Sequence, residues 1–244
     1  MIKEVIVLAG GLGTRLRSVV SDVPKCMAPV AGKPFLHYLT DYLIHQGINH
    51  FIFSVGYKHE IIEEYFHKNY AHLKYQISLE NEPLGTGGAI QLACKKASGK
   101  NVLICNGDTL YNIDVRKLSG FHEETGAECT LCLKPMKDFD RYGVVDLNED
   151  HSVKSFREKK YYKNGLINGG VYSLNVDAFL KEELPERFSF EKEYLEKKIN
   201  NKKENLKIYG LIQDEYFIDI GIPEDYKKAE KEFKSLRLQK PVRK

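Results

Sequence analysis

Residues suited to binding a phosphate group follow the first apolar run of the chain, which continues as Leu8-Ala-Gly-Gly-Leu-Gly-Thr-Arg15. Glycine adopts the positive φ values with which successive backbone N–H groups converge on an anion. Arg15 adds a charged fork that matches phosphate geometry, and Lys25, which follows a proline, adds a point charge. The segment Leu8–Lys25 therefore predicts a loop that binds a nucleoside triphosphate.

Two other phosphate-binding motifs do not fit this segment. A dinucleotide-binding fingerprint needs a small residue at its third position and an acid near the end of the second strand. Leu16 stands at that third position, and the second apolar run ends in Val55-Gly56 without an acid. The P-loop pattern GxxxxGK[ST] is absent. The sequence therefore favours neither an NAD-dependent oxidoreductase nor a P-loop NTPase.

Two apolar strands end beside a carboxylate and a glycine. Val102–Asp108 reads VLICNGD, and Tyr216–Gly221 reads YFIDIG. In open α/β sheets, ligands bind outside the carboxyl ends of the strands. Mg²⁺ takes few protein carboxylates and keeps several waters, so two such acids suit a cation that bridges phosphates. We therefore expect Asp108 and Asp219 to bind Mg²⁺, and Asp114 to cap the helix that follows it.

The elements that must position these residues alternate regularly in the first half of the chain. Short apolar strands that alternate with amphipathic helices predict parallel β-α-β units and a three-layer α/β sandwich. No Pro/Gly/Ser-rich linker follows, so we expect one domain over residues 1–244, with a first half at about 1–112 and a second lobe at about 113–244. The absence of a hexapeptide repeat argues against a C-terminal β-helix. The expected strands are Glu4–Leu8, His50–Val55, Lys74–Leu79, Asn101–Cys105, Ala127–Leu133, Val144–Leu147, Val153–Phe156, Gly169–Leu174, Leu206–Gly210 and Tyr216–Ile218. The expected helices are Pro34–Gln46, His59–Lys68, Thr86–Ala97, Asp114–Thr125, Val176–Glu183, Glu191–Asn200 and Glu224–Leu236.

The composition narrows the class of protein further. A net charge of +3 is too small to make nucleic acid the main partner. The apolar run Val5–Ala9 is shorter than a signal-peptide core, and no later run reaches membrane-spanning length, so we expect a cytoplasmic protein with no membrane partner. Cys129 and Cys132 have CxxC spacing, but in an alternating strand residues three apart face opposite sides, so no metal or redox site is expected there.

The phosphate-loop residues carry a resemblance to a known family. LAGGLGTRL, followed by Pro24-Lys25, resembles the signature of the sugar-nucleotide pyrophosphorylases, which are nucleotidyltransferases that join a nucleotide to a sugar 1-phosphate. The resemblance extends to the DIGxPEDY-like stretch at Asp219–Tyr226. It implies a mixed, mainly parallel Rossmann-like sheet of the glycosyltransferase-A-like kind. The first half would bind the nucleotide and the second half the sugar, and relatives favour a homodimer.

The resemblance also implies a set of site residues. Arg15 and Lys25 would be the catalytic residues, and Asp108 and Asp219 would bind the metal. The implied nucleotide-binding residues are Leu8, Ala9, Gly10, Gly11, Gly13, Thr14, Arg15, Lys25, Glu80, Pro83, Gly85, Thr86, Asn106, Gly107 and Asp108. The implied sugar-binding residues are Gly143, Glu158, Lys159, Asn168 and Gly169. Of these, Glu158 and Asn168 would bind hydroxyls and Lys159 the sugar phosphate.

Two further resemblances point to the substrates. Glu80 falls where family members place a base-reading side chain, and a carboxylate can accept the N1–H and N2–H₂ donors of guanine. The stretch from Arg15 to Leu36 is most similar to guanylyltransferases that use D-glycero-α-D-manno-heptose 1-phosphate. We therefore expect GTP and heptose 1-phosphate to give GDP-heptose and pyrophosphate, for bacterial surface polysaccharides.

Two alternatives remain open at this point. The first is the same reaction with mannose 1-phosphate, another sugar 1-phosphate or another nucleotide. The second is a catalytically silent regulatory subunit that binds a nucleotide sugar. The presence of Arg15, Lys25, Asp108 and Asp219 together argues against the second alternative, because binding alone would tolerate their loss.

Overall fold

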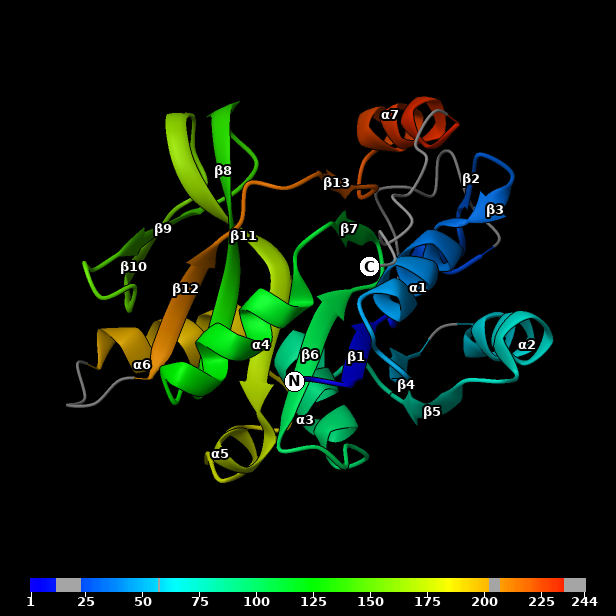
Figure 1. The fold of residues 1–244 in the computed structure, drawn as a ribbon, viewed down its shortest axis with the longest axis horizontal. Helices are drawn as coiled ribbons and strands as arrows, with labels where there is room; N and C mark the ends of the chain where they lie inside the picture. The colour runs from blue at the N-terminus through cyan, green and yellow to red at the C-terminus, as the bar shows by residue number, and fades with distance from the viewer. Residues whose placement is uncertain (12–22, 57, 202–206, 235–244) are drawn as a thin grey trace, which may run out of the picture.

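A nine-stranded sheet runs through the computed structural model, which describes residues 1–11, 23–56, 58–201 and 207–234. The strand order is β10-β9-β11-β6-β1-β4-β5, and β8 pairs with both β11 and β12. Across Figure 1 from right to left, the view passes from β4 and β5 through β1 and β6 to β11, β8 and β12. The predicted α/β sandwich with a mixed sheet is confirmed.

The first half of the chain builds the parallel part of this sheet. Its strands are β1 (Glu4–Leu8), β4 (His50–Val55), β5 (Lys74–Leu79) and β6 (Asn101–Asn106). The connecting helices are α1 (Phe35–His45), α2 (His59–Tyr70) and α3 (Gly85–Cys94). Neighbouring strands pair in parallel in the order β5-β4-β1-β6, so their carboxyl ends share one edge. All four predicted strands are confirmed.

Alternate residues of β1 face the two helical layers. Val5 and Val7 belong to one hydrophobic cluster, which contains the buried face of α1. Ile6 belongs to the other cluster, which contains Ile90 of α3. Because side chains alternate along a strand, both faces of the sheet are covered and β1 reads as a continuous apolar run. The three-layer prediction is therefore confirmed.

The second half adds strands that pair antiparallel with their neighbours, apart from β12, which runs parallel to β8. These are β8 (Cys129–Phe139), β9 (Val144–Leu147), β10 (Val153–Arg157), β11 (Tyr162–Asn175) and β12 (Ile208–Ile212). The helices are α4 (Val115–Glu124), α5 (Val176–Leu180), a π-helical stretch over Phe190–Glu196, α6 (Lys197–Asn200) and α7 (Pro223–Phe233). Asp114 caps α4 as predicted, because its side chain accepts from the N–H groups of Arg116 and Lys117. The buried Cys129 and Cys132 thiols have pKa values raised by desolvation, as core cysteines should.

The strand β11 differs from the prediction, because it begins at Tyr162 rather than at Gly169. Its first part pairs antiparallel with β8, and Tyr162 lies opposite Phe139. Lys163 and Asn164 are exposed there, so this part lacks the apolar alternation that marks a strand in sequence. The register with β8 shifts between Asn168 and Tyr172, where β11 also begins to pair with the central strand β6.

Short strands complete the fold near the carboxyl ends of the parallel strands. β7 (Thr109–Tyr111) pairs antiparallel with β13 (Phe217–Asp219), and β2 (Pro29–Val30) pairs with β3 (Lys33–Pro34). Of these short strands only β13 was predicted, as Tyr216–Ile218. None of the helices in the described part of the chain is both long and apolar enough to cross a membrane.

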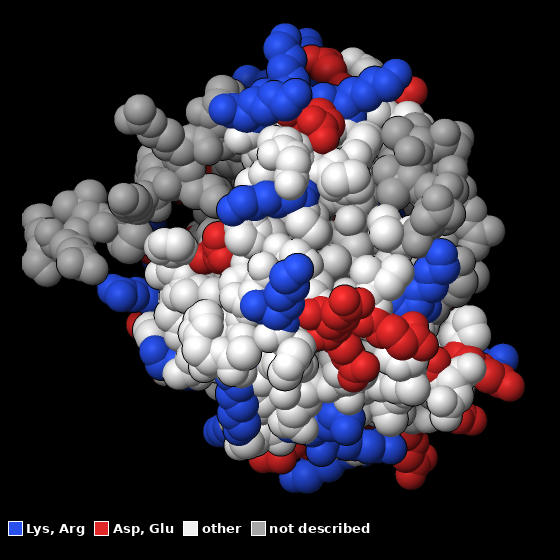
Figure 2. Space-filling view, turned by 90° about the vertical axis from the view of Figure 1, so that its right-hand side faces the viewer, with Lys and Arg blue, Asp and Glu red and all other residues white. Residues whose placement is uncertain are grey.

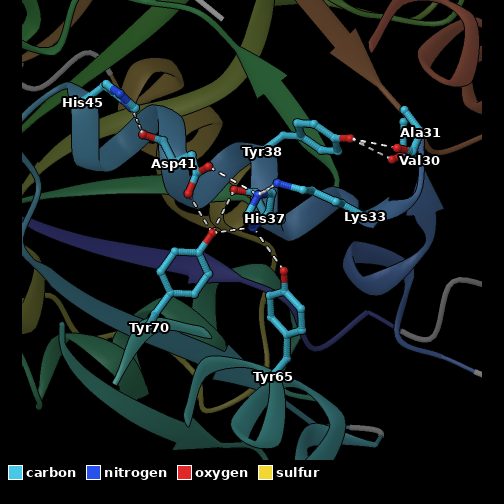
Figure 3. A network of polar contacts seen from close by, with 9 residues as sticks. All are labelled: Val30, Ala31, Lys33, His37, Tyr38, Asp41, His45, Tyr65 and Tyr70. Carbon is cyan, nitrogen blue, oxygen red and sulfur yellow. Dashed lines mark hydrogen bonds and ion pairs between the residues drawn. The ribbon is translucent and has the colours of Figure 1, made fainter. Parts of the chain in front are cut away.

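Polar contacts tie α1 to α2 beside these short strands (Figure 3). The imidazole of His37 lies 2.6 Å from the Tyr70 hydroxyl and 3.1 Å from the Tyr65 hydroxyl. The Tyr70 hydroxyl also donates to Asp41, and the Lys33 ammonium lies 2.6 Å from His37 Nε2. Because an ammonium only donates, this contact requires an unprotonated Nε2, and burial lowers the pKa of His37 accordingly.

The face that carries α2 and α7 bears charges of both signs. Figure 2 views the molecule from that side, and it shows Lys and Arg side chains at the top, centre and bottom, interspersed with Asp and Glu side chains, several of which gather below the centre. This face therefore presents a mixed field rather than one continuous basic surface.

Candidate active site

Lys25, Asp108 and Asp219 meet at the carboxyl edge of the parallel strands. Lys25 begins a 3₁₀ turn after Pro24, Asp108 follows β6, and Asp219 ends β13. The Lys25 ammonium contacts Oδ2 of Asp108 and lies 4.0 Å from Oδ1 of Asp219. The Lys25 side chain is only 14% exposed, so its charge is poorly screened by water. The predicted convergence of the two acids is present.

Backbone hydrogen bonds fix this arrangement. The Gly107 N–H donates to Leu8 O at 2.9 Å, and the Ile220 N–H donates to Asp108 O at 3.0 Å. The Gly221 N–H donates to the Asp219 carboxylate at 2.7 Å. A Cβ at Gly221 would lie 2.7 Å from that carboxylate and 2.9 Å from the Lys25 ammonium. Any other residue there would displace the Asp219 carboxylate and the Lys25 ammonium from their present positions.

The Asp108 and Asp219 pair has more negative charge than the single Lys25 ammonium can balance. Burial, reinforced by the neighbouring Asp108, raises the pKa of Asp219, and Lys25 opposes the rise. Burial and Asp219 also raise the pKa of Tyr142 to about 12. Within the described residues no group of three or more His, Cys, Asp and Glu side chains gathers around a possible metal. Two carboxylates with room for waters and phosphate oxygens are the ligand set that Mg²⁺ accepts.

The start of the phosphate loop lies beside this cluster. The Ala9 N–H donates to Ser54 O at 2.8 Å, which holds the end of β1 against β4. A Cβ at Gly10 would lie 2.7 Å from Oε1 of Glu80, so Gly10 permits a close approach to that carboxylate. A Cβ at Gly11 would meet no atom within 4 Å. The predicted residues Gly13, Thr14 and Arg15 lie outside the described residues.

Glu80 stands at the end of β5, at the same edge of the sheet. Its Oε1 accepts from the Ser54 hydroxyl at 3.2 Å, and its Oε2 accepts from the Leu84 N–H at 3.2 Å. Its own N–H donates to Val55 O at 2.8 Å. Each carboxylate oxygen has capacity for a further hydrogen bond. The carboxylate is therefore fixed in orientation and able to accept from a ligand, while Pro83 lies exposed in the turn that follows.

The glycines after Pro83 pack against the chain itself. Gly85 has φ +72°, and a Cβ there would lie 2.5 Å from Phe188 O. A Cβ at Gly87 would overlap the Phe188 ring, and one at Gly88 would overlap Glu186 O. The Thr86 hydroxyl accepts from the Phe190 N–H at 2.9 Å. These glycines therefore allow residues 186–190 to pack closely against the start of α3.

The predicted sugar-binding residues fall into two places. Asn168 and Gly169 lie at the β11 register shift, where a Cβ on Gly169 would overlap the Tyr111 ring. The adjacent Gly170 has φ +69°, and a Cβ there would lie 2.5 Å from Asn106 Nδ2. These contacts bring Asn106, at the end of β6, next to the bend. Gly143 and the exposed Glu158 and Lys159 lie on the β9–β10 side, where a Cβ on Gly143 would lie 2.7 Å from Arg157 O.

Two polar residues of the site were not singled out in the sequence. Arg141 pairs with Asp225 at 2.6 Å, and Asp219 also helps to raise its pKa. Glu191 accepts from the Asn168 amide at 3.0 Å. Both residues occur in charged stretches of sequence, where nothing distinguishes one charged residue from its neighbours. Only their contacts with distant residues show that they belong to the site.

A pair of acids around a lysine, at the carboxyl edge of a Rossmann-like sheet and beside a glycine-rich loop, defines a protein that binds phosphorylated ligands. The comparisons agree with this class, because residues 4–235 match the family described as Nucleotidyl transferase. The chain therefore belongs to the nucleotidyl transferase family.

Several similar proteins carry a more specific name. The chain is 55% identical, over 94% of its length and 97% of the relative's, to D-glycero-alpha-D-manno-heptose 1-phosphate guanylyltransferase of Aneurinibacillus thermoaerophilus. It is 48% identical, over 91% of its length and 96% of the relative's, to the protein of that name in Campylobacter jejuni. The crystal structure of HddC from Yersinia pseudotuberculosis complexed with GMP-PN superposes with a TM-score of 0.83. That structure is 38% identical and covers 95% of this chain and 100% of its own.

Proposed function

We propose that this protein transfers a guanylyl group from GTP to D-glycero-α-D-manno-heptose 1-phosphate, which yields GDP-heptose and pyrophosphate. The observation that carries the proposal is the Lys25 ammonium between Asp108 and Asp219, beside the first residues of the phosphate loop. The names of the two relatives, at 55% and 48% identity over most of both chains, support the choice of sugar and nucleotide.

The reaction is a displacement at phosphorus. An oxygen of the sugar phosphate attacks the α-phosphorus of GTP, and the bond from that phosphorus to the bridging oxygen of the β-phosphate breaks. The attacking group is already an oxyanion, so no side-chain base is needed. The barrier lies in bringing two polyanions together, so positioning and charge neutralisation supply the catalysis. Lys25 holds the α-phosphate and the sugar phosphate in line, and Arg15 neutralises the triphosphate.

A divalent cation, Mg²⁺, completes the charge balance in our proposal. The Asp108 and Asp219 carboxylates would hold it, and when bound it would neutralise charge on the triphosphate and on the pyrophosphate leaving group. A bound cation would also counter the repulsion within the pair, since Asp108 adds to the rise that burial causes in the pKa of Asp219.

We assign recognition of guanine to Glu80. Its carboxylate is oriented by Ser54 and Leu84 and lies next to Gly10, at the start of the phosphate loop. A carboxylate accepts from the N1–H and N2–H₂ of guanine, whereas adenine has no such pair of donors on that edge. Gly85 and Thr86 remain predicted contacts of the nucleotide on the strength of the resemblance.

We assign the second lobe to the sugar. In this proposal Asn168 and Gly169 contact the sugar from one side, and Gly143, Glu158 and Lys159 contact it from the other. We propose that the reaction takes place in the cytoplasm and that the product serves synthesis of surface polysaccharides. A homodimer stays a prediction.

The test is product analysis with purified protein. Incubation with GTP, heptose 1-phosphate and Mg²⁺ should give GDP-heptose, identified by its mass, and one pyrophosphate per product. A nucleotide sugar formed from ATP, CTP or UTP at an equal or greater rate would contradict the assignment of GTP. No product from any nucleotide and sugar 1-phosphate would contradict the enzymatic function and favour a silent subunit.

A further inference from the structure

Three side chains form a closed hydrogen-bond network at the β11 bend. The Asn168 amide donates to the Tyr172 hydroxyl at 2.7 Å and to Glu191 Oε1 at 3.0 Å. The Asn168 carbonyl oxygen accepts from the Gly170 N–H at 3.0 Å. Both amide hydrogens of Asn168 are therefore committed to protein acceptors, and one lone pair of its carbonyl oxygen remains for a ligand. The network fixes which way the amide of Asn168 points.

Glu191 is the acceptor that orders this network. The buried Tyr172 hydroxyl donates to its Oε1 at 3.1 Å, so one carboxylate oxygen receives both donors. Burial, followed by the charge of Glu191, raises the pKa of Tyr172 well above its ordinary value, so the hydroxyl stays a donor. The Glu191 residue is exposed at the surface. Glu191 therefore lies at the surface beside Asn168, a predicted sugar-binding residue.

Glu196 connects Glu191 electrostatically with a second predicted sugar residue. The pKa of Glu196 is raised by burial and then by Glu158 and Glu191, while Lys192 opposes the rise. Glu158 and Glu191 therefore both lie within electrostatic range of Glu196. Glu191 itself contacts the Asn168 amide.

The position of Glu191 is set from the nucleotide half of the chain. The residue before it, Phe190, donates its N–H to the Thr86 hydroxyl at 2.9 Å. Two backbone bonds reinforce this join, because the Phe188 N–H donates to Leu84 O at 3.0 Å and the Gly87 N–H donates to Phe188 O at 2.9 Å. The turn after Glu80 thus holds residues 188–190 in place, and these residues lead directly into Glu191.

We propose that Glu191 is a positioning residue of the sugar pocket, which orients Asn168, and that Thr86 acts through the Phe190 N–H to position Glu191. The inference rests on the proposed function, since it assigns Asn168 to the sugar. It gives Thr86 a different role from the nucleotide contact that the family resemblance implies. The turn after Glu80 would then be coupled to the sugar pocket, because Thr86 holds the segment that carries Glu191.

Substitutions at Glu191 test the first step. Glu191→Ala removes the acceptor and should raise KM for heptose 1-phosphate roughly tenfold, which corresponds to the loss of about one hydrogen bond to a charged group. KM for GTP should stay within about twofold, because Glu191 lies outside the nucleotide site. Glu191→Gln keeps an acceptor oxygen and should restore most of the sugar affinity. The control is Glu193→Ala, because the Glu193 carboxylate accepts only the Ser189 N–H of its own helix among the described contacts.

Substitutions at Thr86 test the second step. Thr86→Val removes the acceptor with little change of shape and should raise KM for heptose 1-phosphate, whereas Thr86→Ser keeps the hydroxyl and should restore it. A rise in KM for GTP alone in Thr86→Val would overturn the proposal and return Thr86 to the nucleotide site. Equal sugar affinity in Glu191→Ala and wild type would also overturn it.

A readout without turnover separates this proposal from the proposed function. The side-chain amide signals of ¹⁵N-labelled Asn168 report its hydrogen bonds directly. They should shift in Glu191→Ala and in Thr86→Val, and stay in place in Glu193→Ala. Unchanged signals in the first two variants would overturn the proposal. Shifted signals in a protein that forms no GDP-heptose would uphold the network and contradict only the substrate.

Discussion

Lys25 lies 4.0 Å from Asp219, although the two residues come from opposite ends of the described chain. The short ladder between β7 and β13 brings them together, because it pairs Asp219 with Thr109, the residue after Asp108. The ammonium contacts Asp108 and faces Asp219, so one positive charge serves two carboxylates. This imbalance is the physical basis for the roles that we assign to Lys25 and to a divalent cation.

Replacement of Lys25 should reduce the chemical step. In Lys25→Met the positive charge that meets the reacting phosphates is lost, and loss of one such preorganised group costs roughly 100- to 1,000-fold in kcat. The measurement is kcat at saturating GTP and heptose 1-phosphate. Lys134→Met is the control, because Lys134 pairs with the exposed Asp214 away from the acid pair. A kcat near wild type in Lys25→Met would show that its charge has no catalytic role.

Replacement of Asp219 should weaken binding of the cation. Loss of a direct ligand should cost at least as much as loss of an outer-shell partner, which is about 10- to 100-fold in affinity. Titration of nucleotide-bound protein with Mn²⁺, followed by electron paramagnetic resonance, measures the affinity in wild type and Asp219→Asn. Asp214→Asn, an exposed acid that pairs with Lys134, should leave it unchanged. Equal affinity in wild type and Asp219→Asn would remove Asp219 from the metal site.

The difference between these acids and Glu191 shows what the sequence could reveal. Asp108 and Asp219 each follow an apolar strand, and ligands bind at strand ends, so the sequence predicts that they converge. The Glu191 carboxylate occurs in a charged helical turn, and its contact with Asn168 depends on how two distant segments pack. The local sequence pattern cannot predict a contact of this kind. For the same reason the short strands β2, β3 and β7 were not predicted, because they are recognised as strands only by their pairing with other segments.

The glycines give a second example of this limit. In the sequence, Gly85, Gly87 and Gly88 indicate only a close approach to the backbone. The structure shows that residues 186–190 make that approach. The strands β1, β4 and β5 were predictable with the same bounds, since each is an uninterrupted or alternating apolar run between turn residues.

Replacement of Glu80 should change the choice of base. Glu80→Gln loses the charge that strengthens two hydrogen bonds to guanine and presents a donor to a donor, which should lower kcat/KM for GTP roughly 10- to 100-fold. The values for ATP should change little, so the ratio between the two nucleotides falls. Glu82→Gln, in the same turn but paired with the exposed Arg187, is the control. An unaltered preference for GTP in Glu80→Gln would assign base recognition to another residue.

Two glycines in helices should respond oppositely to alanine. A Cβ at Gly87 in α3 would overlap the Phe188 ring, so Gly87→Ala should destabilise the fold by about 1–3 kcal/mol. A Cβ at Gly120 in α4 would meet no atom within 4 Å, so Gly120→Ala should stabilise the fold by about 0.5–1 kcal/mol. Urea denaturation measures both changes. A stabilising Gly87→Ala would contradict the packing of residues 186–190 on α3.

Buried His122 should make stability depend on pH. Desolvation lowers its pKa to about 4, whereas the ordinary value is about 6.5. Above pH 6.5 both folded and unfolded chains hold it neutral. Below that pH the unfolded chain takes up a proton that the folded chain resists, so stability is lost between pH 6.5 and 4, by up to about 3 kcal/mol.

The variant His122→Gln should reduce this loss. Urea denaturation at pH 5 and pH 7 should show a smaller difference in the free energy of unfolding than in wild type. His67→Gln, at an exposed position on α2, should keep the wild-type difference. An undiminished difference in His122→Gln would assign the acid sensitivity to other groups.

The rate of pyrophosphate release from GTP tests the central claim most directly. It is measured with heptose 1-phosphate and with mannose 1-phosphate, in the presence of Mg²⁺, and expressed as kcat/KM for each sugar. Our account predicts release with both GTP and heptose 1-phosphate present and a higher kcat/KM for heptose 1-phosphate than for mannose 1-phosphate. Release with mannose 1-phosphate alone would contradict the proposed sugar, and no release with either would contradict the proposed reaction.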